Sequence, residues 1–271
     1  MRHAIPGQSA VRPLNACVPV LLLLLTAGCQ MVHNGPLEAK ASDEWVRSYD
    51  LDAGGEFQIV GAAGTVDIQG RTGDRVEVRA ERVARAASES TATELVPRIK
   101  IREDLSPQKI VLQTEGLGGI VLGVEVAVNS HVMLPAASRL RVRTTDGALT
   151  IDNISGQVVA SSVNGQITGR GLSGGVEART VNGSLVIDLV AFSQNPVDLR
   201  ATNGRIELAL PAAADANILA NATNGAIEIK ELAFEPLGDQ TKRRVRGRIN
   251  AGGPPIELSV VYGAILVHSR Q

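Results

Sequence analysis

Five copies of one four-residue motif decide the fold: Thr-Thr-Asp-Gly at 144–147, Ser-Val-Asn-Gly at 162–165, Thr-Val-Asn-Gly at 180–183, Ala-Thr-Asn-Gly at 201–204 and Ala-Thr-Asn-Gly at 222–225. The glycines that end the motifs are 18, 18, 21 and 21 residues apart. A nearly constant period of this length is typical of repeat proteins, in which each unit packs mainly against its neighbours. The motif therefore predicts stacked coils rather than a conventional globular core.

Apolar and polar residues alternate on both sides of each motif. In the first copy Leu140 and Val142 precede the glycine by seven and five residues, and Leu149 and Ile151 follow it by two and four. The other copies keep this spacing, except that Gly169 replaces the last apolar residue of the second. Alternation with a period of two is typical of strands with one buried face. Each unit is thus predicted to be a strand, a bend and a second strand.

The bend itself has two interpretations, because Asn-Gly is also a strong hairpin signal. In an antiparallel sandwich or prism, the two strands around each bend would pair with each other. In a solenoid, each strand would pair with its equivalent one unit along. The steady period and the unchanged in/out phase across the bend favour an all-β parallel solenoid with one short helix.

Two further segments fit the same template near the ends of the domain. They are centred on Gly64 and Gly263, with Ala63 and Tyr262 in place of the asparagine. Because Gly263 lies 38 residues after Gly225, about two periods, the last unit is predicted to close the stack.

An open solenoid needs capped ends. Residues 84–96 lack a period of two, are rich in helix formers and are followed by Pro97, so they are predicted to form a short surface helix. This helix and the segment 235–250 are the predicted caps.

The N-terminal 28 residues are typical of a bacterial export signal. A positively charged start precedes the apolar run 18–25, which is too short to span a membrane. Residues 25–29, Leu-Thr-Ala-Gly-Cys, resemble the lipobox of bacterial lipoproteins. That resemblance implies cleavage before Cys29, lipid on its sulfur and an acyl chain such as palmitate on its new amino terminus. In a Gram-negative cell Gln30 would direct such a protein to the outer membrane, on its periplasmic face or at the surface. The alternative is a plain signal peptide cut at another residue.

The chain is therefore predicted to have three parts: a lipoprotein signal peptide at 1–28, a flexible tether at 29–43 and one β-repeat domain at 44–271. Of the two cysteines, Cys17 lies in the removed segment, so the mature chain keeps Cys29 alone and forms no internal disulfide.

Charge is nearly balanced along the chain. Without Arg2 and Arg12 of the signal peptide, 25 Lys and Arg stand against 28 Asp and Glu. Nucleic-acid binding needs a concentrated basic face, so it is not expected. One short basic run is the exception: Lys242, Arg243, Arg244, Arg246 and Arg248. It is interpreted either as a solvated strand edge or as a contact with anionic lipid or lipopolysaccharide.

Few residues are typical of catalysis. His131 and His268 are flanked by strand residues, and no His or Cys cluster has the spacing of metal ligands, so neither metal nor cofactor is expected. A β-helix enzyme acting on polysaccharide would group carboxylates on one face. The candidates are Asp67, Asp152, Asp188 and Asp198, whose offsets from the bends differ. Aromatic residues are also scarce, which counts against a tight sugar-binding cleft.

The repeated bend residues are predicted to form a ladder along the stack: Asp146, Gly147, Asn164, Gly165, Asn182, Gly183, Asn203, Gly204, Asn224, Gly225 and Gly263. A functional interpretation makes them a polar strip for calcium or a ligand. The structural interpretation is favoured, because Asn and Gly accept positive φ at a corner and stacked amides bond to one another.

Together, three features resemble a family of bacterial exported proteins: the Thr-x-Asn-Gly units, the Leu-Pro-x-x segments at 134–137 and 210–213, and Gly-Gly-Pro-Pro-Ile-Glu-Leu at 252–258. Its members carry β-strand repeats and are described as adhesins of unknown function. The resemblance covers about 44–267 and implies a right-handed β-solenoid, without catalytic residues.

The sequence thus predicts a lipid-anchored cell-envelope protein with a non-catalytic structural or interaction role, such as an adhesin-like one. The alternatives are a β-helix polysaccharide-active enzyme and an envelope-stress or assembly factor. Expected partners are the membrane through the N-terminal lipid, and an envelope polysaccharide, lipopolysaccharide or another envelope protein.

Overall fold

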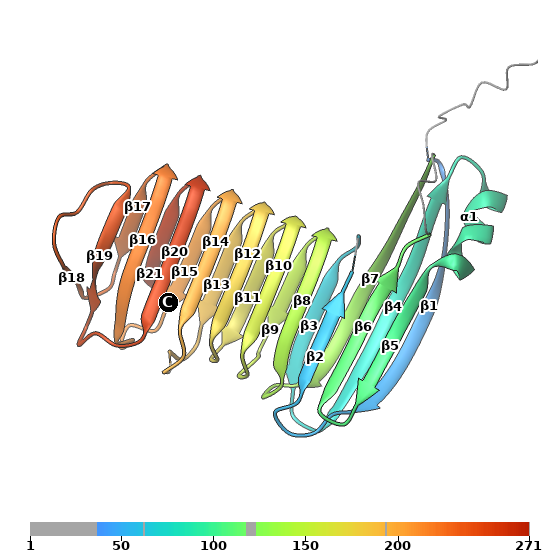
Figure 1. The fold of residues 1–271 in the computed structure, drawn as a ribbon, viewed down its shortest axis with the longest axis horizontal. Helices are drawn as coiled ribbons and strands as arrows, with labels where there is room; N and C mark the ends of the chain where they lie inside the picture. The colour runs from blue at the N-terminus through green and yellow to red at the C-terminus, as the bar shows by residue number, and fades with distance from the viewer. Residues whose placement is uncertain (1–36, 62, 118–122, 193, 271) are drawn as a thin grey trace, which may run out of the picture. The chain divides into compact units, whose positions relative to one another are not determined.

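The computed structural model describes residues 37–61, 63–117, 123–192 and 194–270, which form two β-sheets around a shared core (Figure 1). The predicted signal peptide, Cys29 and the first part of the predicted tether lie outside these residues. Within them, no helix has the length and apolar character needed to cross a membrane.

Sheet A has ten strands, in the spatial order β1 (Ala39–Asp50), β4 (Arg75–Ala86), β7 (Val124–Pro135), β3 (Val66–Arg71), β9 (Leu149–Asp152), β11 (Ile167–Leu172), β13 (Leu185–Leu189), β15 (Ile206–Leu210), β21 (Ile265–Ser269) and β17 (Ile227–Lys230). Sheet B has eleven: β18 (Phe234–Pro236), β19 (Arg244–Ile249), β16 (Ala216–Asn224), β20 (Pro255–Tyr262), β14 (Val197–Asn203), β12 (Val176–Asn182), β10 (Val158–Asn164), β8 (Arg139–Asp146), β2 (Glu56–Val60), β6 (Lys109–Glu115) and β5 (Lys100–Ser106).

Each predicted unit is one coil of a solenoid, with one strand in sheet B, the bend, and one strand in sheet A. Val158 of β10 pairs in parallel with Leu140 of the preceding coil and with Val176 of the following one. Ile167 of β11 does the same with its equivalents in sheet A. Strands pair with their equivalents and not across the bend, so the solenoid prediction is confirmed and the sandwich is wrong.

The core follows from the alternation in the sequence. Leu140 and Leu149, from opposite sheets, are almost completely buried in a single cluster that continues through all the coils. Burying one such side chain contributes about 1.5–3 kcal/mol relative to leaving it exposed, so the stack is stabilised by the same layer repeated along its length. Each of the two repeated Leu-Pro pairs lies at the end of a strand, because β7 ends at Pro135, just after Leu134, and β15 ends at Leu210.

The coils at the two ends are not stacked in chain order. The last coil, β20 and β21, lies between β14/β15 and β16/β17, so the prediction that it closes the stack is wrong. At the other end the first coil, β2 and β3, lies between β6/β7 and β8/β9. The template of apolar positions is the same in every coil and carries no information about which neighbour a coil takes.

Antiparallel strands extend both sheets at one end and sheet B alone at the other, where sheet A ends with the parallel strand β17, so both sheets are mixed. β1 pairs with β4 and β5 pairs with β6 at one end, while β18 and β19 extend sheet B at the other. The segment 235–250 is thus a cap, as predicted. The tether prediction is too long, because β1 begins at Ala39 and its alternating small and polar residues pair with β4.

The predicted helix is shorter than 84–96. Ala84 is buried in β4, and α1 spans Glu89–Leu95, followed by the short 3₁₀ helix η1 (Val96–Arg98). Ser88 begins α1 because its hydroxyl accepts the backbone N–H of Thr91. Helix α1 packs on β1 and β4 beside the antiparallel edge (Figure 1).

Candidate functional site: a cross-strand groove beside an amide ladder

The bend residues form the predicted ladder over four coils. The amide nitrogen of Asn203 donates to Asn182 Oδ1 (2.8 Å), Asn182 donates to Asn164 Oδ1 (2.7 Å), and Asn164 donates to Asp146 Oδ1 (2.8 Å). An amide both donates and accepts, whereas a carboxylate only accepts. Asp146 therefore suits the end of the ladder that receives the N–H groups, which supports the structural interpretation of the asparagines.

The ladder stops where the coil order departs from the chain order. Asp146 lies beside Ala63, which has no amide to offer. At the other end Asn203 pairs in register with Tyr262, and Tyr262 pairs with Asn224. Asn224 therefore lies one coil beyond the amide ladder, which corrects the prediction that it extends the ladder, whereas the column of bend glycines continues through Gly263 to Gly225.

The glycines are required for close approach of the coils, and Gly147, Gly183, Gly204 and Gly263 also have positive φ. Gly147 has φ +120°, but no ladder asparagine is among the described non-glycine residues with positive φ. A Cβ on Gly165 would overlap the carbonyl oxygen of Gly147, and one on Gly183 would overlap that of Gly165. In the same column Gly165 N donates to Asn182 O (2.9 Å). Neighbouring backbones hydrogen-bond at the bend and leave no room for a side chain.

A groove runs across the strands of sheet B next to this ladder. We call it the cross-strand groove; its volume is about 550 Å³. It is lined by Arg143, Thr144, Ser161, Ser162, Val163, Arg179, Thr180, Val181, Arg200, Ala201, Thr202, Ser259 and Val261. These residues come from β8, β10, β12, β14 and β20, which are consecutive in the sheet. Neighbouring strands are about 4.8 Å apart, so five strands give a groove about 19 Å long.

Two in-register rows form the walls of the cross-strand groove. One row lies four residues before each bend glycine and contains Arg143, Ser161, Arg179, Arg200 and Ser259. The other lies two residues before each glycine and presents exposed valines, with Val163 and Val181 each 42 % exposed and Val261 36 %. Guanidinium groups and methyl groups thus face each other along the groove.

The arginines of the groove differ in their partners. Arg179 forms ion pairs with Glu177 (2.9 Å) and Asp198 (3.5 Å), and Arg200 pairs with Asp198 (2.7 Å). The hydrogen bond from Arg200 to Asp198 raises the pKa of the Arg200 guanidinium above its usual value. Arg143 has no acidic partner among the described residues, because its neighbours in register are Val60 and Ser161.

The basic run lies on the same sheet, beyond β16. Arg244, Arg246 and Arg248 are exposed on one face of β19, as the alternation predicted. Arg248 pairs with Glu235 of β18 (2.7 Å), whereas Lys242 and Arg243 lie in the turn before β19. Within the described chain Arg244 and Arg246 have no acidic partner.

The carboxylates considered for an enzyme are dispersed. Asp198 lies on the outer face of sheet B, while Asp67, Asp152 and Asp188 lie on strands of sheet A. Their partners are separate: His131 for Asp67 (3.2 Å), Arg170 for Asp152 (3.8 Å) and Arg270 for Asp188 (3.0 Å). His268 lies 3.7 Å from Glu207. In the described parts of the chain, no three His, Cys, Asp or Glu side chains converge as metal ligands would.

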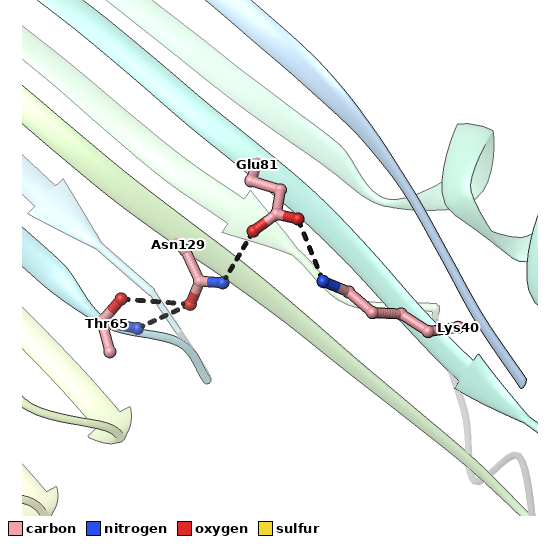
Figure 2. A network of polar contacts seen from close by, with 4 residues as sticks. All are labelled: Lys40, Thr65, Glu81 and Asn129. Carbon is pink, nitrogen blue, oxygen red and sulfur yellow. Dashed lines mark hydrogen bonds and ion pairs between the residues drawn. The ribbon is translucent and has the colours of Figure 1, made fainter. Parts of the chain in front are cut away.

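A separate polar network fixes the start of the domain to the first coil (Figure 2). Lys40 of β1 donates to Glu81 of β4 (3.2 Å), and Asn129 of β7 donates to the other oxygen of Glu81 (3.2 Å). Asn129 Oδ1 accepts from both the backbone N–H and the hydroxyl of Thr65 (3.1 Å each). The Asn129 amide and then Lys40 lower the pKa of Glu81 below its usual value.

A second contact joins the two sheets at the same end. The Tyr49 hydroxyl of β1 donates to Glu103 Oε2 of β5 (2.7 Å), and Arg47 lies 3.6 Å from the same carboxylate. Burial, and then the bond to Glu103, raise the pKa of Tyr49 well above its usual value. The guanidinium of Arg47 also lies 4.9 Å from the ring centre of Trp45.

Sequence reasoning missed the cross-strand groove, although its signal is present. When the five units that line the groove are aligned on their bend glycines, the residues four positions before the glycines form the arginine row. The residues two positions before them form the valine row. Only the bend positions themselves were considered as a ladder. Tyr262 stands in the row of bend residues, at the place of the asparagine. Its side chain is the most exposed large apolar one among the described residues, at 58 %.

These features define a class of protein: a two-sheet β-solenoid whose repeated bend units present a continuous surface across the strands. The chain belongs to the Toastrack family (DUF4097), which matches residues 54–268. The predicted membership of a β-strand-repeat family of unknown function is thereby confirmed.

The chain is similar to solved structures at low sequence identity. A "putative cell adhesion protein" from Clostridium sporogenes is 11 % identical, with a TM-score of 0.55, and the match covers 85 % of this chain and 100 % of that one. A "putative adhesin" from Bacteroides fragilis is 12 % identical, with a TM-score of 0.38 over 84 % of this chain and 97 % of the other. At such identity the first likeness shows a common fold. No curated protein matches the chain.

Proposed function

We propose that this chain is a lipid-anchored protein of the bacterial cell envelope with a non-catalytic, adhesin-like interaction role. The observation that carries the proposal is the cross-strand groove, an open surface built on a stack of coils held by one continuous core. The Toastrack family and the Clostridium protein described as a "putative cell adhesion protein" support an interaction role.

The anchor is proposed from the sequence of the leader. Cys29 follows a lipobox-like segment, and β1 begins at Ala39, ten residues later. A short connection of this kind would hold the solenoid close to the membrane that carries the lipid. Several acyl chains at about 0.8 kcal/mol per buried CH₂ give a stable anchor, whereas a single chain binds only marginally.

The basic run offers a second contact with the envelope. Arg244 and Arg246 are exposed and have no acidic partner within the described chain, so their charges are available to an anionic surface. Lys242 and Arg243 precede them in an exposed turn. Each charge held close to an anionic membrane adds about 1 kcal/mol, which supports contact with anionic lipid or lipopolysaccharide.

The dispersion of the carboxylates supports a non-catalytic role. Glycoside hydrolysis uses two carboxyl groups within about 5–9.5 Å on the two sides of one bond. Asp198 lies on sheet B and the other three candidates lie on sheet A, each with its own basic partner. The alternative of a polysaccharide-active enzyme finds no paired site among these four residues.

The proposal is tested by metabolic labelling with palmitate in cells that express the wild-type chain or Cys29→Ala. We expect label on the wild type alone, and an unprocessed precursor when globomycin blocks the lipoprotein signal peptidase. A surface-adhesion assay on the same cells should show contact that the anchored chain confers and the variant does not. An unlabelled product cut at another residue would overturn the anchor, and equal adhesion with both chains would overturn the adhesin-like role.

A further inference from the structure

We propose that the cross-strand groove binds a linear anionic glycan lying across the strands of sheet B. This inference rests on the proposed interaction role and names the class of ligand. It concerns residues of five coils, with Arg143 as the principal charged contact.

The arginines of the groove indicate that its ligand is negatively charged. Arg143 is exposed and unpaired within the described residues, while Arg179 and Arg200 each retain about half of their side-chain surface exposed despite their ion pairs. A guanidinium presents a planar fork of N–H donors that fits a carboxylate or a phosphate. Along its length the groove therefore has one arginine without an acidic partner, Arg143, and two arginines whose charges are partly neutralised by ion pairs, Arg179 and Arg200.

The remaining lining fits a sugar chain. Hydroxyl groups of Ser161, Thr202 and Ser259 alternate with the exposed methyl groups of the valine row. Sugar rings present hydroxyls at their edges and C–H groups on their faces, so a groove with both kinds of surface complements them. The exposed Tyr262 ring follows Val261 on the chain and lies in the bend row, outside the residues that line the groove.

The sheet geometry favours a glycan over an extended peptide. The floor of the groove is made of β10, β12 and β14, each of which pairs in parallel on both sides. Their backbone groups are already hydrogen-bonded, so a peptide could not add itself as a further strand. A ligand here must be recognised by side chains alone.

Repetition compensates for the scarcity of aromatic residues. Equivalent positions recur every coil, about 4.8 Å apart, so a polymer with a regular repeat meets a similar contact at each step. Several weak contacts made by one chain reinforce each other, because each one raises the effective concentration for the next. The groove therefore suits a long chain and not a single sugar.

The experiment is calorimetric titration of the full chain carrying Cys29→Ala with size-matched oligomers of alginate, dextran and polyglutamate. We expect alginate to bind, with affinity rising with oligomer length, and neutral dextran not to bind. Arg143→Ala should weaken alginate binding about tenfold, as expected for the loss of one charge-assisted hydrogen-bonded contact. Tyr262→Ala should weaken it less.

Arg141→Ala is the matched control. Arg141 lies two residues from Arg143 on β8, is also exposed and without an acidic partner in the described chain, and does not line the groove. A loss of less than twofold in this variant supports the groove, whereas equal losses at 141 and 143 would overturn it in favour of general charge attraction. No binding of alginate, or equal binding of polyglutamate, would also overturn the proposal. Melting curves of each variant exclude unfolding, and none of these outcomes bears on the palmitate label.

Discussion

The central coils and the two ends of the solenoid differ in how chain order relates to spatial order. From β8 to β15 each coil stacks on the one that precedes it in the chain, and the amide ladder runs from Asp146 to Asn203. At both ends a coil has been inserted between two others, and the ladder stops where this happens. Antiparallel strands then extend both sheets at the first end, and sheet B alone at the second.

This difference separates two roles of the sequence. The apolar template determines what a coil is, since the bend units share four apolar positions, apart from Gly169 in the second unit. The bend residue determines how far the amide ladder extends, because asparagine continues the ladder whereas Ala63 and Tyr262 do not. The centre is therefore held by repeated core layers and amides, and the ends by individual side-chain networks such as the one around Glu81 (Figure 2).

The largest expected effect comes from the core. Leu208→Ala removes a fully buried side chain of β15 that is in register with Ile187 and Val267, so the free energy of unfolding should fall by about 2–5 kcal/mol. Ile229→Ala in β17, the outermost strand of sheet A, removes a half-buried side chain and should cost less than half as much. Urea unfolding of both variants measures the difference, and equal losses would contradict a gradient from centre to end.

Close packing at the bends gives the next largest effect. Gly165→Ala places a Cβ against the carbonyl of Gly147, so we expect a loss of about 1–3 kcal/mol in the free energy of unfolding. Gly116→Ala is the control, since nothing lies within 4 Å of its added Cβ and its φ is not positive. If the two substitutions have the same effect in urea unfolding, the bends are not the tight contacts described.

The ladder should contribute less, because its amides are exposed to water. Asn182→Ala leaves Asn164 Oδ1 and Asn203 Nδ2 without their partner, and should lower the free energy of unfolding by about 1 kcal/mol. Asn224→Ala, beyond Tyr262, should change it by much less. Thermal unfolding of the pair distinguishes the ladder from a general effect of asparagine at bends, which would make the two variants alike.

The smallest effect is a dependence on pH at the N-terminal end. The folded pKa of Glu81 is lowered, so its contribution is fully present above the ordinary glutamate pKa of 4.5 and is lost as the pH falls through the folded value. Glu81→Gln should therefore lower the melting temperature at pH 7 and approach the wild type in acid. Asn182→Ala should show no such convergence, and a constant difference for Glu81→Gln would exclude the carboxylate as the cause.

Much of the fold could be predicted from the sequence because each coil repeats a local rule. The positions of Leu140, Val142, Leu149 and Ile151 around Gly147 determine the strands, the bend and the buried face. The register of the stack followed from the asparagines, which pair as expected from 146 to 203.

The rest could not be predicted for a physical reason. Ala-Thr-Asn-Gly occurs identically at 201–204 in β14 and at 222–225 in β16. Judged by local sequence, β16 is therefore as good a neighbour for β14 as β20, which is the strand that lies there. The choice depends on long-range contacts, including the antiparallel pairing of β16 with β19. The cross-strand groove was missed because it is a property of columns that run across coils, whereas the chain was analysed along its strands.

The inserted last coil has a consequence for the order in which the chain can fold. The coil formed by β20 and β21 is the last in the chain but lies between two earlier coils. It can take this position only if β16 and β17 have not already stacked on β14 and β15. If β16 stacked directly on β14, Asn224 would continue the ladder and the competing assembly would satisfy every local rule of the repeat. Closing such distant contacts is slow compared with local ones. The molecule therefore cannot be completed coil by coil in chain order, and its final residues decide whether the earlier ones reach their native partners.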